Sequence, residues 1–561
     1  MEKTEKLSKN ERIIFCILIA AAAAVRLIGA NFNLPNIYTT EEYKIVNYAL
    51  KMGGGDLNPH FFNYPSLYLY FTLIVSGIYF LAGKFFGVFH SAHEFAVSFF
   101  KDPSGIYLTM RLFSGIWSTS TVIVTYFFTK ELFGKRTGLI TVLFLAFIPS
   151  ILISSHEIRP NMPSMFLVIT AFYLILRFLK EDDYRYFYSA GALIGLATSI
   201  YYNAVFLGIL MPLVHFFARR GIKAFDFRLW IGLLIMPLLF FAGTPFAVLD
   251  FNSFYRDASA HSQGALGNLP TGLGAVALHY LYIGHNIHIT PFMGILCYAG
   301  IIALLPALKT RRGVILLFFA ILLFTVPAAM YFAPGLGYLF PAFPLFLSAG
   351  GYLLNAIYLR NKYIFYFLLI VCLTPSVWDS AELIRVFLSE DTRTSAGKWV
   401  EDNLENDSKI LVDMAAHSPP MKETKRQIER LYRRAEKLNH YKKEYLKLKL
   451  ETYSENTKGY EIWRIFHAPL EVSGTADVRL VLEAQKTQDL VDISGGWKRV
   501  KKLGFKYFIY NNVDEHAAVV SANPALIKFY SEMPRNTELL ARFEPRSRIY
   551  PTPSVEVRKI K

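Results

Sequence analysis

The chain is long, apolar and poor in charge. Of its 561 residues, 53% are hydrophobic, 16% aromatic and 18% charged, whereas soluble domains average about 25% charged residues. Because the deficit lies in long apolar runs, the composition excludes a soluble globular protein and predicts a polytopic membrane protein. The formal net charge of +16 does not indicate a nucleic acid partner, since cationic loops beside membrane helices are the expected orientation signal. Cys16, Cys297 and Cys372 lie inside apolar runs and predict neither disulfides nor a metal site.

The apolar runs predict eleven membrane-spanning helices. A bilayer core needs about 20 apolar residues per helix, and about 17 are tolerated. The predicted spans are residues 12–30, 112–129, 137–154, 162–179, 186–200, 201–218, 229–247, 290–308, 313–332, 337–358 and 363–379. One further run, 64–83, is rich in the tyrosine and phenylalanine of interfacial helices, and we interpret it as a helix in the outer interface that does not cross.

Lysine and arginine gather at every second connection. The clusters are Lys3/Lys6/Lys9/Arg12, Lys130/Lys135/Arg136, Lys180/Arg185, Arg219/Arg220/Lys223, Lys309/Arg311/Arg312 and Arg360/Lys362. They share one side only if the run 64–83 does not cross the membrane. Because positive loops favour the cytoplasm, the pattern predicts a plasma (inner) membrane protein with its N-terminus inside and its C-terminus outside.

Three outer loops follow from this topology: 31–111, 154–163 and 250–272. The first is too long to be a mere connector, and it carries the adjacent Glu41 and Glu42. Paired carboxylates at the outer face can bind a cation, act as a general base, or be solvated loop charges.

Cations and hydrogen-bonding residues accompany these acids. The second loop carries His156, Glu157, Arg159 and Asn161, while Arg26 and Arg111 stand near the outer ends of two spans. A cation in the upper part of a span is usually a snorkelling anchor. Several cations that converge with carboxylates would instead suit a phosphate beside a reacting hydroxyl.

From about residue 380 the composition is that of a soluble domain. We therefore divide the chain into a transmembrane domain, 1–379, and an extracytoplasmic domain, 380–561. Helix and strand patterns alternate there, with a helix over 392–404, a buried strand over 408–414, a helix followed by a strand over 496–511 and a final strand over 554–560, so we expect an α/β domain. Residues 420–450 predict an amphipathic helix with Ile428, Leu431, Ala435, Leu438 and Tyr445 on one face. That helix either packs on its own domain or attracts anionic head groups.

The order of these motifs resembles a known superfamily. An uncleaved first helix ending "RLIGANFNLP", an acidic pair, "GDLNPHFFNYPSLY", "RLFSG", "TKELFGKRTG" and "SSHEIRPNMP" are followed by "GLATSIYYNA", "GTPFAVLDF", "GYLFPAFP", "TRTSAGKWVEDNLENDSKILVD" and "LGFKYFIY". This series resembles the GT-C membrane glycosyltransferases of the protein O-mannosyltransferase and aminoarabinose transferase superfamily (glycosyltransferase family 39-like). The resemblance covers nearly the whole chain. It implies a polytopic helical fold with interfacial helices in the first outer loop.

The resemblance also implies an activity. Members transfer a sugar from a polyprenyl-phosphate donor to an acceptor hydroxyl at the outer face, in one displacement with inversion, and an acid in the first outer loop is the base. At the matching positions of this sequence, the resemblance implies that the catalytic residues are Glu41, as the base, and Glu42. The expected donor and phosphate ligands are Arg26, Arg111, His156, Arg159, Asn161, His60, Asn63, Tyr64 and Tyr202. We expect His60, Asn63 and Tyr64 to line a cavity for the sugar, with Arg111 or Arg159 at the phosphate.

The partners implied are a polyprenyl-phosphate sugar, membrane lipids and an acceptor of unidentified class: a protein, a lipid or a glycan. No cofactor and no metal ligands are assigned, although the paired acids can hold a divalent cation. Several positions depart from the family. The usual Asp-Glu pair is Glu41-Glu42, and the usual aspartate of the second loop is Asn161, which cannot serve as a base.

A lysine often found in "TSxKYN" corresponds to Tyr201, and an arginine often preceding "YLLP" corresponds to Gly337. Two readings follow from these departures: an active transferase with a shifted donor or acceptor, or a degenerate member that binds lipid-linked sugar or scaffolds a partner. A transporter is a more distant alternative, because the sequence has no visible inverted repeat.

Overall fold

The computed structural model divides the chain into two compact units, which are described separately. It describes residues 8–218, 226–266, 290–309, 311–330, 337, 339–413, 417–465, 486–512, 524–550 and 552–561. The membrane unit comprises Met1–Ala30, Glu41–Ile78 and Tyr107–Ile384. The sheet unit comprises Asn31–Thr40, Tyr79–Ile106 and Arg385–Lys561. The first outer loop predicted above is therefore shared between the units.

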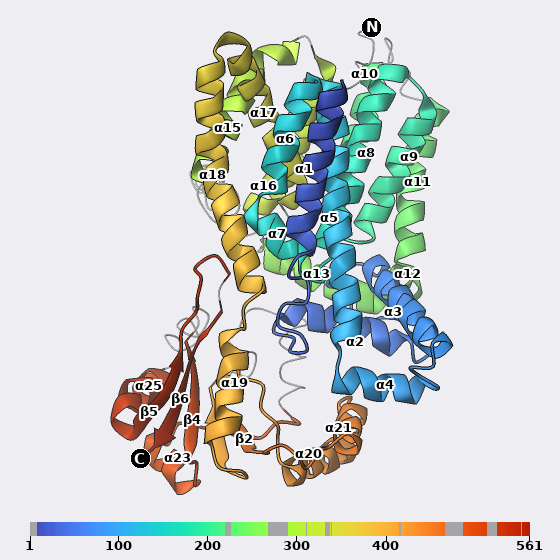
Figure 1. Cartoon of the computed structure of the whole chain (residues 1–561). Coiled ribbons are helices and arrows are strands. Elements are labelled where there is room, and N and C mark those ends of the chain that lie inside the picture. Colours follow the sequence, from blue (N-terminus) through green and yellow to red (C-terminus); the bar gives the residue numbers. More distant parts are fainter. Residues whose placement is uncertain are drawn as a thin grey trace. The chain divides into compact units, whose positions relative to one another are not determined.

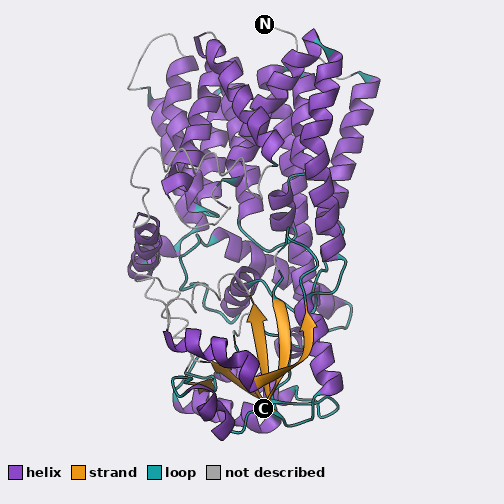
Figure 2. Ribbon diagram, turned by 90° about the vertical axis from the view of Figure 1, so that its left-hand side faces the viewer, coloured by secondary structure: helices purple, strands orange, loops and turns teal. Residues whose placement is uncertain are grey.

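Helices build the membrane unit (Figures 1 and 2). Those that lie or begin in it are α1 (Lys9–Leu27), α2 (Thr40–Met52), α3 (Leu67–Phe85), α5 (Ser104–Phe133), α6 (Lys135–Ala146), α7 (Pro149–Ser155), α8 (Asn161–Glu181), α9 (Tyr184–Thr198), η1 (Tyr202–Ile209), α10 (Leu210–Ala218), α11 (Phe227–Gly243), α12 (Phe246–Leu249), α13 (Phe251–Leu266), α15 (Pro291–Leu304), η2 (Leu305–Lys309), α16 (Arg312–Met330), η4 (Phe340–Ala342), α17 (Phe343–Arg360) and α18 (Lys362–Phe387). A helix or a pair of helices occupies each of the predicted spans.

Small residues let the helices of this unit approach one another closely. A Cβ at Gly195 of α9 would clash with the carbonyl oxygen of Met236 on α11, and one at Gly300 of α15 would clash with that of Ala349 on α17. Helices in lipid associate by such backbone contact, because hydrocarbon supplies no hydrophobic force between them. The helices also bury a continuous apolar core that includes Phe144, Phe172 and Leu347.

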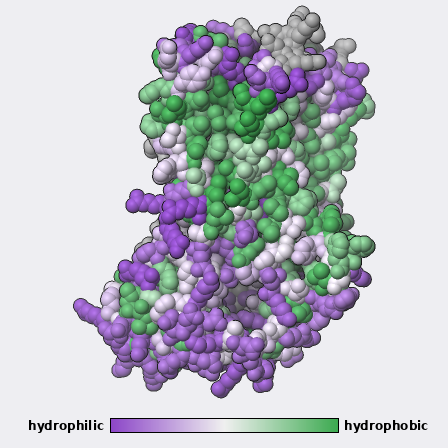
Figure 3. Space-filling view, in the orientation of Figure 1, coloured by the Kyte–Doolittle hydropathy of each residue, from purple (hydrophilic) through white to green (hydrophobic). Residues whose placement is uncertain are grey.

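The predicted number of spans stays a prediction. Within the described residues, six helices are long and apolar enough to cross a membrane, or seven if the bent pair α6 and α7 counts as one span. α10 with η1, α11 and the first part of α16 are shorter apolar helices. α3 meets the same condition of length and hydropathy, although we predicted that it does not cross. Figure 3 shows the apolar surface of this unit, whose helices expose Ile17, Leu238 and Ile302 as lipid-facing side chains would be.

Hydrophilic residues gather at the end of the membrane unit where α1 begins (Figures 1 and 3). Lys135 pairs with Glu11 at 3.2 Å, and Lys180 pairs with Glu131 at 2.5 Å. The Arg136 guanidinium lies 4.2 Å from the ring centre of Tyr358 near the end of α17. The described basic clusters at the α5–α6 and α8–α9 connections and at the end of α17 thus share one end of the unit, as the predicted topology requires. Arg219, Arg220 and Lys223 lie outside the described residues, as do 267–272 of the third outer loop.

The sheet unit is built on a mixed sheet of six strands (Figure 2). Its elements are α4 (Ala92–Lys101), α19 (Thr392–Asn403), β1 (Lys409–Val412), α20 (Lys425–Lys437), α21 (Lys443–Glu451), β2 (Glu461–Ile465), β3 (Leu490–Val491), α23 (Gly496–Lys502), β4 (Tyr507–Asn512), α25 (Pro524–Asn536), β5 (Thr537–Phe543) and β6 (Ser554–Ile560). The strand order is β3-β2-β1-β4-β6-β5. β1 pairs in parallel with β2 and β4, and β6 is antiparallel to both β4 and β5. Alternating side chains fill an apolar core on each face.

The predicted helix over 420–450 consists of two helices, α20 and α21. Asn439 lies between them with a left-handed φ of 47°. The predicted Ile428, Leu431 and Ala435 are buried, whereas Leu438 is exposed, because the chain leaves the helix before the periodic pattern reaches it. Tyr445 is exposed too, and the neighbouring Leu446 is buried in its place.

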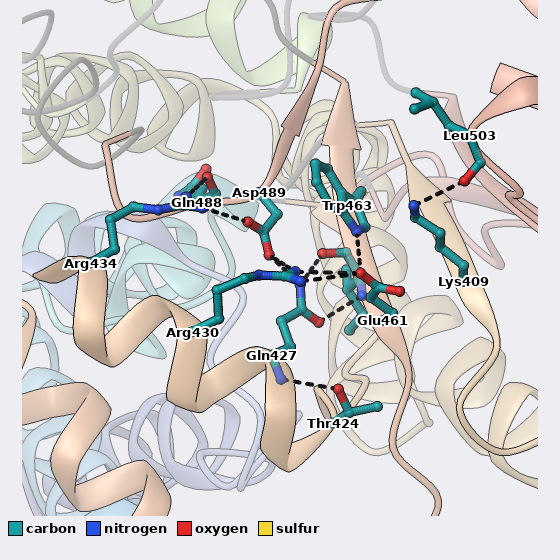
Figure 4. A network of polar contacts seen from close by, with 11 residues as sticks. Lys409, Thr424, Gln427, Arg430, Arg434, Glu461, Trp463, Gln488, Asp489 and Leu503 are labelled. Atoms are coloured by element: carbon teal, nitrogen blue, oxygen red, sulfur yellow. Dashed lines mark hydrogen bonds and ion pairs between the residues drawn. The ribbon is translucent and has the colours of Figure 1, made fainter. Parts of the chain in front are cut away.

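A polar network fixes α20 on the sheet (Figure 4). Asp489, beside β3 and buried, accepts hydrogen bonds from Arg430 Nη2 at 2.6 Å and from Arg434 Nη2 at 3.2 Å. Gln427 Nε2 donates to the same carboxylate at 3.0 Å. The arginines that face the sheet are therefore used within the unit, which supports packing on its own domain for this part of the helix.

Candidate active site

Glu42 and Arg111 form a buried clamp in the membrane unit. Glu42 lies in the first turn of α2, where the positive end of the helix dipole stabilises a carboxylate. Arg111 of α5 donates from Nε to Oε1 and from Nη2 to Oε2 of Glu42, both at 2.8 Å. The backbone N–H of Ile158 donates to Oε1 at 3.0 Å. Because the two side chains are 0% and 1% exposed, the clamp fixes α2, α5 and the 156–160 loop together.

Glu41 lies in a different environment from its neighbour. Its side chain is 26% exposed. Tyr64 donates its hydroxyl to Oε2 at 2.8 Å, and Lys44 contacts Oε1 at 3.4 Å. The Tyr64 ring stacks on Tyr201, with ring centres 6.0 Å apart. Glu41 is thus held from two sides and remains partly exposed.

The loop between α7 and α8 supplies a second acid and a second cation. Glu157 pairs with Arg159 at 2.6 Å, and their side chains are 5% and 35% exposed. Burial raises the pKa of Glu157; the Arg159 charge opposes this rise, and the nearby negative charges of Glu42 and Glu41 add to it. Glu157 thus belongs to the same group of charges, although the sequence gave us no reason to assign it a role.

His156 and Arg26 contact backbone carbonyl oxygens. His156 places Nδ1 2.8 Å from the carbonyl oxygen of Leu152 and Nε2 2.9 Å from that of Ile28. Burial lowers the pKa of His156, although both carbonyls favour the protonated ring. Arg26 is fully buried. It donates to Ser118 Oγ and to the carbonyl oxygens of Ala22, Leu145 and Ala146 at 2.8–3.0 Å.

Arg26 therefore satisfies carbonyl groups at the end of α6, where α6 and α7 meet at a 65° bend. Two of our expected phosphate ligands thus have partners within the chain. Arg26 contacts backbone and serine, and Arg111 contacts Glu42 and the carbonyl oxygen of Ala30. Donors that are buried and already bonded are not offered to a phosphate, so Arg159 is the better placed of the predicted arginines.

The 56–65 segment of the first outer loop is fixed by acids that our sequence reasoning missed. His60, with a φ of 49°, contacts Asp56 at 2.9 Å through Nε2 and Asp250 at 3.6 Å through Nδ1. The Phe62 N–H donates to the buried Asp257 at 3.1 Å, and Tyr202 donates its hydroxyl to the Phe62 carbonyl oxygen at 2.9 Å.

His60 and Tyr202 thus hold the loop, and Tyr64 is the member of this segment that reaches Glu41. Asn63 lies half-buried in the same segment, next to Tyr64. Asp250 and Asp257 belong to the third predicted outer loop, whose contacts with the first could not be read from their spacing.

Asn161 and Gly337, two of the departures from the resembled family, face each other. Asn161 begins α8 and is nearly buried. A Cβ built on Gly337 would lie 2.7 Å from Asn161 Nδ2 and 2.9 Å from its Oδ1. The two changes thus concern one place in the structure, where no larger side chain fits at residue 337 without moving Asn161. Among the described residues, no group of three or more His, Cys, Asp or Glu side chains is arranged to hold a metal ion.

The chain matches a known protein family and several solved structures. A family model described as dolichyl-phosphate-mannose-protein mannosyltransferase matches residues 106–243, from α5 to α11. The structure of ArnT from Cupriavidus metallidurans bound to undecaprenyl phosphate matches with a TM-score of 0.52 and 14% identity over 97% of each chain. The chain has the GT-C fold. The apo form of the same ArnT matches with a TM-score of 0.50 and 13% identity over 97% of each chain.

AglB from Archaeoglobus fulgidus, in complex with an inhibitory peptide and a dolichol-phosphate, has a TM-score of 0.47 and 13% identity over 98% of this chain and 75% of its own. No curated protein sequence matches the chain. The resemblance to the GT-C superfamily, predicted from the motifs, is confirmed, and the chain is a membrane protein. At 14% identity the ArnT match shows the fold alone.

Proposed function

We propose that this GT-C protein is a membrane glycosyltransferase that moves a sugar from a polyprenyl-phosphate donor to an acceptor hydroxyl at the outer face of the membrane. Two findings support a lipid-linked donor: the family model names a dolichyl-phosphate mannose, and the ArnT of the same fold was captured with undecaprenyl phosphate. The acceptor is a protein, a lipid or a glycan. The site of the reaction is the group of charges around Glu41.

One observation carries the choice of base. Of the two adjacent acids, Glu42 is fully buried with both oxygens on Arg111, whereas Glu41 is 26% exposed and held by Tyr64 and Lys44. A general base must reach the proton that it takes, within about 2.6–3.2 Å or through one water. Glu41 is therefore the base, and Glu42 positions α2.

The reaction is a single displacement. The acceptor oxygen forms a bond to the anomeric carbon of the sugar while the bond from that carbon to the phosphate oxygen breaks. The acceptor proton passes to Glu41, and the lipid phosphate leaves with the electron pair of the broken bond. Attack from the face opposite the leaving group inverts the anomeric centre, and no covalent sugar–enzyme bond forms.

Arg159 is the residue proposed to meet the phosphate. It is one-third exposed, and its Nε pairs with Glu157 at 2.6 Å. A guanidinium presents parallel donors to a phosphate, which a lysine cannot reproduce. Arg159→Lys should therefore weaken the binding of lipid phosphate. Arg111 substitutions should instead lower the stability of the protein, because Arg111 is already bound to Glu42.

A second candidate function rests on the contact between Asn161 and Gly337. Neither residue supplies a charge at this point, and Tyr201 stacks on Tyr64 in a third position that departs from the family. These uncharged residues favour a protein that binds a lipid-linked sugar, or scaffolds a partner, without turnover. The two functions differ in whether lipid phosphate is released.

The deciding experiment incubates the purified protein in nanodiscs with a panel of polyprenyl-phosphate sugars and measures released lipid phosphate. Glu41→Gln is nearly isosteric but cannot take the proton, so release should fall by about 100-fold or more while lipid-phosphate binding is kept. Glu41→Asp, which keeps the acid and shortens its reach, should retain part of the rate. If Glu41→Gln turns over as fast as the parent, Glu41 is not the base. If the parent releases no lipid phosphate from any donor, the binding function is preferred.

A further inference from the structure

Apolar side chains are exposed where α3 ends and the chain turns toward α4 (Figure 1), a segment that belongs to the sheet unit. Phe85 and Phe86 are 84% and 77% exposed, and Leu81 and Val88 are exposed as well. Soluble surfaces rarely gather large apolar side chains in this way, and such patches mark contacts with a protein or a membrane. We call these four residues the apolar tip.

The apolar tip is not needed for the packing of the turn, because other rings fill its inner side. Phe89 is buried, and its ring centre lies 5.3 Å from that of Phe95, which lies 5.3 Å from that of Phe80. Phe85 and Phe86 instead meet each other edge-on, with ring centres 5.2 Å apart. The turn therefore has its own small core, and the tip is left for a partner.

Helix α4 connects the apolar tip to the rest of the sheet unit. The ring of Phe100, at the far end of α4, lies 5.2 Å from that of Tyr445 on α21. His93 Nε2 lies 3.5 Å from Glu451 at the end of α21. Because α21 shares a buried cluster with α20, and α20 is fixed on the sheet, a partner bound at the tip holds the sheet unit.

The apolar tip continues an exposed stripe of α3. Ile74, Ile78, Leu81 and Phe85 recur at spacings of three or four residues and are all exposed, so they lie on one face of the helix. α3 begins in the membrane unit, and it meets the condition of length and hydropathy for a membrane helix. A stripe that starts among lipid-facing helices favours lipid as its partner.

The contacts of α3 place both of its ends on the outer side in the topology predicted above. The Leu67 N–H, at the start of α3, donates to the carbonyl oxygen of Ser199 at 3.0 Å, beyond the end of α9 that is opposite to its basic connection. The other end of α3 leads into the sheet unit, which follows the outer end of α18. A helix with both ends on one side lies along the interface and does not cross.

The charges near the apolar tip suit phospholipid head groups. Lys84, within the tip sequence, is exposed, and no aspartate or glutamate occurs between Asp56 and Glu94. A carboxylate close to hydrocarbon is costly, whereas a lysine can extend its ammonium group toward the head groups while its stem stays in apolar surroundings. The tip thus combines apolar side chains with a positive charge and lacks the acids that lipid would exclude.

We propose that the apolar tip inserts into the outer leaflet and anchors the sheet unit to the membrane. The partner is the phospholipid bilayer, with Phe85 and Phe86 at the boundary of head groups and acyl chains, about 5–10 Å deep. The anchor keeps a domain of soluble composition at the membrane surface, independently of the anchoring by the spans. It goes beyond the proposed transferase function and does not depend on it.

The test measures the depth of a fluorescent label. Phe86→Cys, Ile78→Cys and Lys437→Cys are each made in the full chain with Cys16→Ser and labelled with NBD, a polarity-sensitive dye. Lys437 is the matched control, because it is exposed on α20 of the same unit. The nanodiscs contain phosphatidylcholine brominated either near the head group or near the chain ends. Lipid brominated near the head group should lower the emission of Phe86→Cys and Ile78→Cys by about twofold or more and leave that of Lys437→Cys unchanged.

A double variant tests whether the two rings carry the insertion. Phe85→Ser/Phe86→Ser should keep the fold, because both rings are exposed. With the label at Val88→Cys, quenching by lipid brominated near the head group should be strong in the parent and lost in the double variant. Hydrogen exchange of α4 in nanodiscs should be faster in the double variant, since α4 is then held only by α21.

Three results would overturn the proposal. The label at Phe86→Cys could report surroundings as polar as those of Lys437→Cys, which would place the tip in water. Its emission could be shifted to the blue without quenching by either brominated lipid, which would assign the tip to a protein partner such as a second copy of the chain. Lipid brominated near the chain ends could quench Ile78→Cys more than Phe86→Cys, which would mean that α3 crosses the membrane.

Discussion

Glu42→Gln should destabilise the membrane unit far more than Glu41→Gln, although the two residues are adjacent. Glutamine keeps the size of Glu42 but removes the charge that the fully buried Arg111 guanidinium contacts through two hydrogen bonds of 2.8 Å. Removing one partner of a buried ion pair costs about 3–5 kcal/mol, because the other charge stays buried without compensation. The glutamine can still accept from the Ile158 N–H at Oε1, so the loss falls mainly on the ion pair.

Glu41→Gln provides the matched control. Glu41 is 26% exposed, and its ion pair with Lys44 spans 3.4 Å. Pairs of this kind contribute about 0–1 kcal/mol. The two substitutions are chemically identical and lie on the same turn of α2. The free energies of unfolding of the two variants should therefore differ by about 2–5 kcal/mol, and this difference measures the effect of burying and pairing the Glu42 carboxylate.

The double variant Glu42→Met/Arg111→Met tests the reasoning further. It removes both charges together, so no unpaired charge stays buried. It leaves the Ile158 N–H and the Ala30 carbonyl oxygen without their side-chain partners, at about 1–3 kcal/mol each. The double variant should therefore be less destabilised than the sum of Glu42→Met and Arg111→Met.

Thermal stability in detergent is the measurement. Each variant is heated in steps, and the fraction that still elutes as a single species by size-exclusion chromatography gives an apparent melting temperature. Glu42→Gln should melt several degrees below the parent, and Glu41→Gln within about a degree of it. If Glu42→Gln and Glu41→Gln have the same apparent melting temperature, the carboxylate of Glu42 is not the partner of Arg111 in the protein. The proposal that Glu42 positions α2 would then be wrong.

Three other substitutions test the site and the topology. Tyr64→Phe removes the 2.8 Å hydrogen bond to Glu41 and should lower the rate of lipid-phosphate release by about tenfold at an unchanged melting temperature; an unchanged rate would show that Tyr64 does not position the base. The labelling test uses a Cys16→Ser background, because Cys16 is exposed. Lys130→Cys should then react with an impermeant maleimide only from the cytoplasmic side, and a cysteine in the sheet unit only from outside. Labelling of both cysteines from outside would mean that α3 crosses the membrane. Gly337→Ala, whose Cβ would lie 2.7 Å from the amide that begins α8, should lower the melting temperature, and unaltered stability would show that this amide moves freely.

The order of helices and strands could be predicted from the sequence. Long apolar runs gave helices at the predicted spans, because a spanning segment must satisfy its own backbone hydrogen bonds in lipid. Residues 409–412, 507–512 and 554–560 form strands within or beside the ranges that the alternating patterns predicted. The basic connections at one end of the membrane unit follow from charge alone. These are local or compositional properties, so neighbouring residues along the chain suffice to define them.

The roles of the individual polar residues depended on tertiary structure. Glu41 and Glu42 are the same amino acid in the same turn, yet successive helical residues point about 100° apart, so one faces Arg111 and the other Tyr64. From the sequence we expected Arg26 to bind phosphate, and in the structure its guanidinium donates to carbonyl groups at the end of α6. A charge becomes a ligand, a clamp or a base according to what lies opposite it. Those partners come from distant parts of the chain, and only the packing of the helices brings them together.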